Sequence, residues 1–203
     1  KTKVSGGEGG ALRLAVATTV TNCTFTGNVA TGNGGAILVL QDSAKGNNVV
    51  VQGTTFTGNS GAEGGAISVA TNCSVALQDV LCENNTTTKA FGSFTTWGYG
   101  DIRVADNTAK GAVSISGKIV ATIWNNQAHA IEVAGALTQG SDVTIDWRLG
   151  KLSVNKVGIK FGSEQIMQAS KGFIKLGIDA GTKEGWKLQY SAASPWQATL
   201  VKE

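Results

Sequence analysis

The chain has 203 residues, enough to bury a sizeable core, and a formal net charge of +3 at neutral pH. No apolar run approaches the roughly 20 residues of a membrane-spanning helix, and the first residues lack the apolar region of a signal peptide. The basic excess consists of isolated lysines after residue 150, without the arginines and interleaved aromatics of a nucleic-acid patch, so nucleic acid is not an expected partner.

A glycine-rich motif recurs along the first part of the chain. It reads Gly-Gly-Ala-Leu at 9–12 and Gly-Gly-Ala-Ile at 34–37 and 64–67. A second motif, Thr-Phe-Thr-Gly-Asn, is identical at 24–28 and 55–59, so both motifs keep a period of about 30 residues. A fixed period of this kind is typical of a protein built by stacking one small unit.

The residues after each glycine pair alternate between two faces. Ile37 and Val39 match Ile67 and Val69 in the next copy, as expected for a short, half-buried strand. With the β-branched run around 49–51, each period holds two or three short strands with tight corners, which is the size of one coil of a parallel β-helix. The sequence therefore predicts an all-β fold, a right-handed parallel β-helix.

The repeat assigns structural roles to particular residues. The glycines should turn sharply and leave space where backbones crowd, while the Phe and Asn columns should stack between coils, the Asn amides forming a ladder. These structural repeat residues are Gly34, Gly35, Gly64, Gly65, Phe25, Asn28, Phe56 and Asn59. A worn third copy places Cys82 in the Phe column, Asn85 in the Asn column and Ile102 beside Ile67.

Three cysteines are an odd count for a protein that relies on disulfides. We predict free buried thiols at Cys23, Cys73 and Cys82, and a bridge between two of them remains the open alternative. The spacing of potential ligands lacks the clusters that a metal site needs, so no metal and no cofactor are expected.

The combination of Gly-Gly-Ala-Ile or Gly-Gly-Ala-Leu with Phe-x-x-Asn, repeated in alternation, resembles the repeats of the chlamydial polymorphic membrane proteins and related large bacterial surface proteins. The resemblance covers about the first half of the chain. It implies a right-handed β-helical passenger that is displayed at the cell surface and used in adhesion. Because the chain starts just before the first glycine motif, we interpret it as a piece of a solenoid and expect preceding β-helix coils of the parent protein as partners.

The second half reads as longer strands without the glycine motif. Strands are predicted at 129–133, 143–147, 156–161, 172–178, 186–190 and 196–201. One helix is predicted from Ser163 as N-cap, with Lys171 in its last turn and Gly172 just after it. We divide the chain into β-helix coils at 1–149 and a C-terminal β-rich cap at 150–203, since terminal repeats must cover exposed backbone.

A polysaccharide-active enzyme of the pectate lyase type is the main rival interpretation, because such enzymes use the same solenoid. Their chemistry needs two or three carboxylates close together, and the 14 acidic residues here are scattered. Asp101 with Arg103 is the nearest pattern and is predicted to be a surface ion pair; Asp142 with Asp146 is the next. The single histidine, His129, has no neighbouring acid or nucleophile, so no catalytic residue is predicted.

An aromatic segment at 91–99 interrupts the repeat. Phe91, Phe94, Trp97 and Tyr99 are the predicted ligand-binding candidates, since aromatic rings on a solenoid loop suit contact with a protein or a sugar. The alternative is that these rings pack against the wall of the solenoid. The sequence thus predicts a secreted or cell-surface adhesin or display scaffold that meets a host or matrix protein or glycan; a carbohydrate-binding module using Trp97 and Tyr99 is a further alternative.

Overall fold

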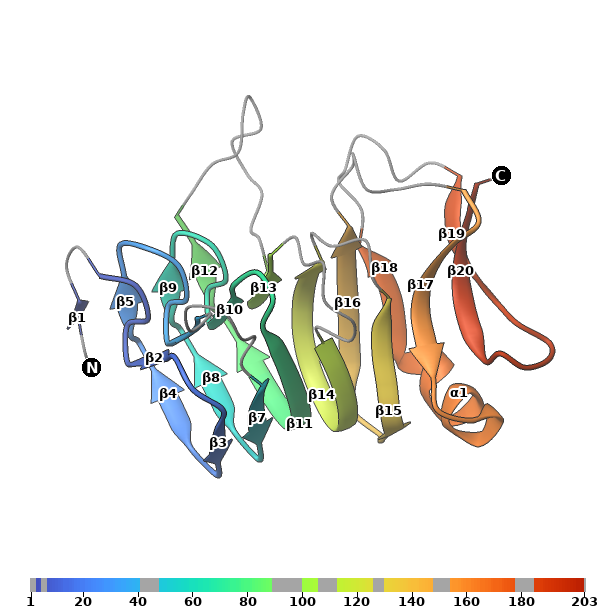
Figure 1. The fold of residues 1–203 in the computed structure, drawn as a ribbon, viewed down its shortest axis with the longest axis horizontal. Coiled ribbons are helices and arrows are strands. Elements are labelled where there is room, and N and C mark those ends of the chain that lie inside the picture. The colour runs from blue at the N-terminus through green and yellow to red at the C-terminus, as the bar shows by residue number, and fades with distance from the viewer. Residues whose placement is uncertain are drawn as a thin grey trace.

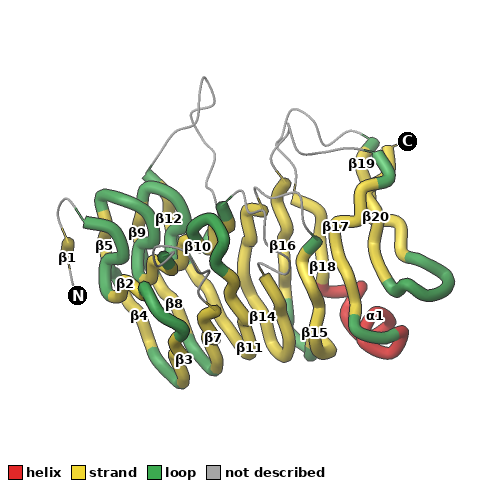
Figure 2. Tube along the Cα trace, viewed as in Figure 1, coloured by secondary structure: helices red, strands yellow, loops and turns green. Residues whose placement is uncertain are grey.

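The structure is a computed structural model that describes residues 3–4, 7–40, 48–88, 100–105, 113–125, 130–147, 154–177 and 185–202. These residues form an elongated stack of strands with one short α-helix near the C-terminal end (Figure 1; Figure 2). The described strands make one large, mainly parallel sheet and a smaller four-stranded sheet. The all-β class with extensive parallel pairing is confirmed.

The strands follow the repeat closely in the first half. They are β1 (Lys3–Val4), β2 (Leu12–Leu14), β3 (Thr18–Thr21), β4 (Thr24–Thr26), β5 (Val29–Ala30), β6 (Ile37–Val39), β7 (Asn48–Gln52), β8 (Thr55–Thr57), β9 (Ser60–Gly61), β10 (Ile67–Val69), β11 (Ser74–Glu83), β12 (Thr86–Thr87) and β13 (Ile102–Val104). The second half contributes β14 (Val113–Asn125), β15 (Ile131–Leu137), β16 (Asp142–Trp147), β17 (Lys156–Phe161), β18 (Ile174–Gly177), β19 (Trp186–Tyr190) and β20 (Gln197–Lys202).

Successive copies of the glycine motif lie directly side by side. Strands β2, β6, β10 and β13 pair in parallel, with Leu12, Ile37, Ile67 and Ile102 in one register column. The three isoleucines of this column are fully buried. The predicted column is therefore confirmed. Each repeat adds one strand to the sheet, so the same position of the motif returns to the same face in every repeat.

The two glycines of the motif have different roles, as Gly34 and Gly35 illustrate. Gly34 has a φ of +73°, which L residues with a Cβ rarely adopt. A Cβ on Gly35 would lie only 1.9 Å from the carbonyl oxygen of Gly65 in the neighbouring repeat. The motif thus requires one glycine for the turn and one for the close approach of two backbones.

The phenylalanine column is also in register. Phe25 on β4 pairs with Phe56 on β8, which pairs with Cys82 on β11. The two rings stack with centroids 5.0 Å apart and planes 7° from parallel. Phe56 is fully buried, whereas Phe25 is half-buried because β4 has a paired strand on one side only.

The asparagine column forms the predicted amide ladder. The backbone N–H and the Nδ2 group of Asn28 both donate to Oδ1 of Asn59, at 3.0 and 2.8 Å. Asn59 repeats the pattern with Oδ1 of Asn85, at 3.0 and 2.9 Å. The amides of Asn59 and Asn85 also donate back to the carbonyl oxygens of Phe25 and Phe56, each at 3.0 Å, so they bond to the repeat on either side.

The cross-section of the stack changes after β13. The four-stranded sheet β1-β5-β9-β12 ends at β12. Strand β14 then runs for 13 residues, pairing with β11 in its first part and with β13 at its end. One long strand thus replaces two strands and the corner between them, and this step in the stack positions the candidate site described below.

The C-terminal end combines parallel and antiparallel pairing. Strands β17 and β18 continue the parallel ladders of β15 and β16, while β20 pairs antiparallel with both β17 and β19. The division into coils at 1–149 and a cap at 150–203 stays a prediction. In the part of the chain that the structure describes, no helix has the length and apolar character needed to cross a membrane.

The predicted helix is α1 (Glu164–Ser170), and Ser163 is its N-cap, with Oγ accepting from the N–H of Ile166 at 3.2 Å. Its predicted C-terminal end is confirmed in position, since Gly172 directly follows the C-cap. Lys171 is the C-cap, and Gly172 lies inside a 3-10 helix at Lys171–Phe173 that leads into β18. The chain tightens into that 3-10 turn, so the helix needs no left-handed glycine to end it.

All three cysteines are free, with Cys73 and Cys82 buried and Cys23 half-buried. The prediction of free thiols is confirmed. Burial, helped by the nearby carboxylate of Asp101, raises the pKa of the Cys82 thiol well above its ordinary value. Cys82 therefore behaves as a small core residue rather than as a nucleophile.

Candidate functional site

The four aromatic residues predicted to bind a ligand, Phe91, Phe94, Trp97 and Tyr99, lie outside the described residues, as does His129. Their role stays a prediction. The described residues nevertheless contain a groove that sequence reasoning did not find, and Asp101 is one of the residues that line it.

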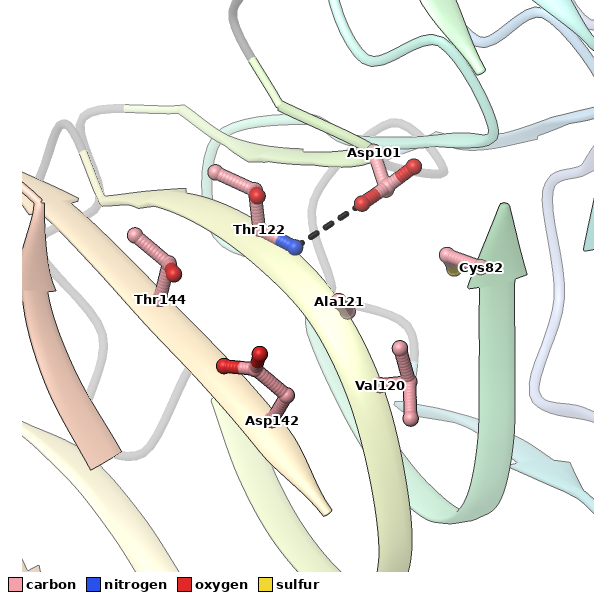
Figure 3. A pocket seen from close by; sticks show the side chains of 7 residues that line it. All are labelled: Cys82, Asp101, Val120, Ala121, Thr122, Asp142 and Thr144. Carbon is pink, nitrogen blue, oxygen red and sulfur yellow. Dashed lines mark hydrogen bonds between the residues drawn. The ribbon is translucent and has the colours of Figure 1, made fainter. Parts of the chain in front are cut away.

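The groove has a volume of about 160 Å³ and lies at the step in the stack (Figure 3). Its lining comes from four places: strand β11, the residue just before β13, strand β14 and strand β16. The lining residues are Cys82, Asp101, Val120, Ala121, Thr122, Asp142 and Thr144.

Along the phenylalanine column, the side chains become smaller at the point where the four-stranded sheet ends. Cys82 follows Phe56 in the column, and the pairing of Leu81 with Val120 puts Ala121 beside Cys82. The side chains of this column thus become smaller just where β12 has no successor. Less of the chain covers the surface here, and a groove is left.

Asp101 ends the asparagine ladder. Its Oδ1 accepts from Nδ2 of Asn85 at 2.9 Å, and its Oδ2 accepts from the backbone N–H of Thr122 at 2.8 Å (Figure 3). Both groups that face the carboxylate are donors, so a group with two acceptor oxygens satisfies them where an amide would not. Burial is the largest influence and raises the pKa of Asp101, although both hydrogen bonds act to lower it.

The predicted surface ion pair between Asp101 and Arg103 is not formed. Nε of Arg103 lies 3.0 Å from Oε2 of Glu63, in an ion pair that lacks an aligned hydrogen bond at Nε, and both side chains are largely buried. The guanidinium also lies 5.9 Å from the ring centroid of Trp124. The error has a physical cause. Asp101 lies just before β13, where its carboxylate bonds to Asn85 and Thr122, while Arg103 lies in β13 beside the Gly64 turn of the preceding repeat.

Burial lowers the pKa of the Arg103 guanidinium, and the charge of Glu63 opposes that shift. Glu63 was missed from the sequence, although its position directly before the Gly64 turn was visible. A buried pair of this kind adds little net stability, but removing one partner leaves an uncompensated buried charge and is strongly destabilising.

Asp142 and Asp146, the other acidic pattern noted in the sequence, do not meet at one site either. Oδ1 of Asp142 pairs with Nζ of Lys175 at 2.8 Å on the exposed rim of the groove. Asp146, on the same strand, lies against Gly177, where a Cβ would be 2.0 Å from its Oδ1. Among the described residues, no three histidine, cysteine or acidic side chains are grouped so that they could hold a metal ion.

Two threonine hydroxyl groups also line the groove. Thr122 and Thr144 are direct neighbours in the register of β14 and β16. Both are half-exposed. The groove therefore combines two threonine hydroxyls with a carboxylate that is fully occupied by structural hydrogen bonds and a carboxylate that is paired with a lysine.

The comparison with known families agrees with the motifs. The repeat of the Chlamydia polymorphic membrane proteins matches residues 22–39 and 53–70. Each matched segment contains one Thr-Phe-Thr-Gly-Asn motif and the glycine motif that follows it, so the chain carries two copies of that repeat. No curated protein and no solved structure matches the chain.

Proposed function

We propose that this chain is a right-handed parallel β-helix domain of a bacterial cell-surface protein and that it acts as a non-catalytic display scaffold or adhesin. The observation that carries the proposal is the stacked polymorphic membrane protein repeat with its buried amide ladder. The ladder ties neighbouring repeats together from Asn28 to Asp101, which suits a rigid spacer that holds a binding segment away from a surface.

A scaffold role is supported by how the charged groups are used. Asp101 spends both oxygens on the ladder and on Thr122, Arg103 is paired with Glu63, and Asp142 is paired with Lys175. A polysaccharide-active enzyme would need a carboxylate free to hold a metal or to move a proton at the reacting bond. Two carboxylates lining one groove are the observation that keeps this second candidate function in view.

The binding role is assigned to the aromatic segment, with Phe91, Phe94, Trp97 and Tyr99 as contact residues and a host or matrix protein or glycan as partner. The outer columns of the repeats offer small polar side chains such as Thr24, so little apolar area is available elsewhere in them for a binding hot spot. One copy would bind weakly, and many copies on a surface would bind strongly.

Preceding β-helix coils of the parent protein are the proposed structural partner. Strands β2, β3 and β4 each pair on one side only within the described residues. Their threonine-rich sequence favours strand pairing, and Arg13 is the only charge on them. An edge with so little protection is normally covered by another strand.

The test uses beads coated with the purified domain and cultured epithelial cells or immobilised matrix proteins. Replacing both Trp97 and Tyr99 with Ala should reduce bead adhesion while the free energy of unfolding changes by less than about 1 kcal/mol, the range for exposed sites. Adhesion that is absent in the wild type, together with unfolding of the double variant, would contradict the binding role.

The enzyme alternative is tested separately. Incubation with pectin, alginate, chondroitin and neutral glycans, with and without calcium, should release no product. Turnover that the Asp101→Asn variant abolishes would replace the scaffold proposal with a catalytic one.

A further inference from the structure

The groove between Asp101 and β16 contains recognition groups that the fold does not use. The hydroxyls of Thr122 and Thr144 have no hydrogen-bond partner among the described residues, although Asp101 and the backbone around them are fully engaged. Strand pairing sets the backbones of these two residues about 4.8 Å apart, with both side chains on one face of the sheet. Each hydroxyl can donate one hydrogen bond and accept two.

The rim of the groove adds a donor and an acceptor. Asp142 and Lys175 form an exposed ion pair with 2.8 and 2.9 Å contacts, and each keeps hydrogen-bonding capacity beyond that pair. Figure 3 shows Asp142 and Thr144 on one strand, facing Thr122 on the next, with Asp101 at the far side. Hydrogen-bond donors and acceptors therefore lie together on one face of β14 and β16.

Size and charge narrow the class of ligand. A volume of about 160 Å³ is well below the 300–1,000 Å³ of sites for drug-sized molecules, so the groove suits one ring-sized unit. The formal charges of Asp101, Asp142 and Lys175 leave the groove with one negative charge, which disfavours an anionic ligand. Val120 and Ala121 are the only aliphatic side chains in the lining, which offers little to an apolar ligand.

We propose that this groove binds one neutral pyranose unit of a glycan, with the hydroxyls of Thr122 and Thr144 and the Asp142–Lys175 pair contacting the hydroxyl groups of the sugar. The site uses none of the four aromatic residues among its lining and goes beyond the scaffold role, since a scaffold needs no ligand at this place. Asp101 acts as a positioning residue here, because it fixes the backbone of Thr122 without touching the sugar.

The experiment is a ¹H–¹⁵N correlation NMR titration of the isolated domain with methyl glucoside, galactose and N-acetylglucosamine, and with glucuronate as the anionic comparison. We expect saturable shifts of the Thr122, Thr144 and Asp142 amides with at least one neutral sugar and a weaker response to glucuronate. Each lost hydrogen bond is worth about 0.5–1.5 kcal/mol, so Thr144→Val should weaken binding about 2- to 12-fold.

The matched control is Thr57→Val, on β8 outside the groove, where the threonine is also half-exposed. It should leave the sugar affinity unchanged. If Thr144→Val lowers thermal stability, Lys175→Gln on the exposed rim provides a second test with the same expected direction. Absence of saturable shifts with all three neutral sugars, or equal weakening by Thr57→Val, would refute the groove as a sugar site. Neither result would bear on the proposed adhesion by the aromatic segment, which is tested separately.

Discussion

Truncation of Phe56 to Ala is the sharpest test of the stacked repeat. The ring is fully buried and lies between Phe25 and Cys82 in the column, stacked on Phe25 at 5.0 Å. Removing a buried phenylalanine costs about 3–5 kcal/mol, and the stacked pair accounts for about 0.5–1.5 kcal/mol of that loss. A chain of this size loses about 2–4 °C in Tm for each kcal/mol, which gives a decrease of roughly 6–20 °C.

The assay is thermal denaturation for Tm and urea denaturation for the free energy of unfolding, each followed by circular dichroism and by tryptophan fluorescence. All five tryptophans lie after residue 96, so fluorescence reports on the later part of the chain, whereas circular dichroism reports on all strands. If neighbouring repeats unfold partly independently, Phe56→Ala should shift the circular dichroism transition before the fluorescence transition.

Phe25→Ala is the matched control, because the same side chain is only half-buried in the first repeat. It should cost clearly less than Phe56→Ala. The double variant should fall short of the sum of both costs by about the stacking energy, 0.5–1.5 kcal/mol. A cost below about 1 kcal/mol for Phe56→Ala, or an equal cost for Phe25→Ala, would show that the column reasoning is wrong.

Three further variants test other contacts. Gly64→Ala (φ +71°) places a Cβ 2.2 Å from the backbone carbonyl oxygen of Ile67 and should destabilise more than Gly58→Ala (φ +62°), which meets nothing within 4 Å; equal losses in urea denaturation would exclude a steric contribution. Burial raises the pKa of Asp101 in the folded state above its ordinary value of 3.8, so this residue stabilises the fold most below pH 3.8 and less as the pH rises through the folded pKa. Asp101→Asn should remove this dependence of the unfolding free energy on pH. A constant difference in unfolding free energy between the two proteins from pH 4 to 8 would contradict it. Arg103→Met leaves the buried carboxylate of Glu63 without its cation and should cost about 3–5 kcal/mol, whereas adding Glu63→Gln should recover part of the loss; additive costs would argue against a buried pair.

The repeat itself was readable from the sequence, and the reason is the stacking geometry. Each repeat lies one strand spacing from the next, so a residue and its counterpart about 30 positions later become neighbours, and Phe25 meets Phe56 as Asn28 meets Asn59. The same argument correctly put Cys82 and Asn85 in these columns, although the letters around them had changed.

The groove and the buried charges were decided only by the tertiary structure. Asp101 and Arg103 are two residues apart, yet one ends a ladder that starts at Asn28 and the other pairs with Glu63. Each of these contacts occurs once, so no period in the sequence predicts it. Both depend on the one place where the four-stranded sheet ends and β14 continues as a single long strand. Periodic contacts repeat in the sequence and can be read there, whereas a contact made once at an irregular step exists only when the chain is folded.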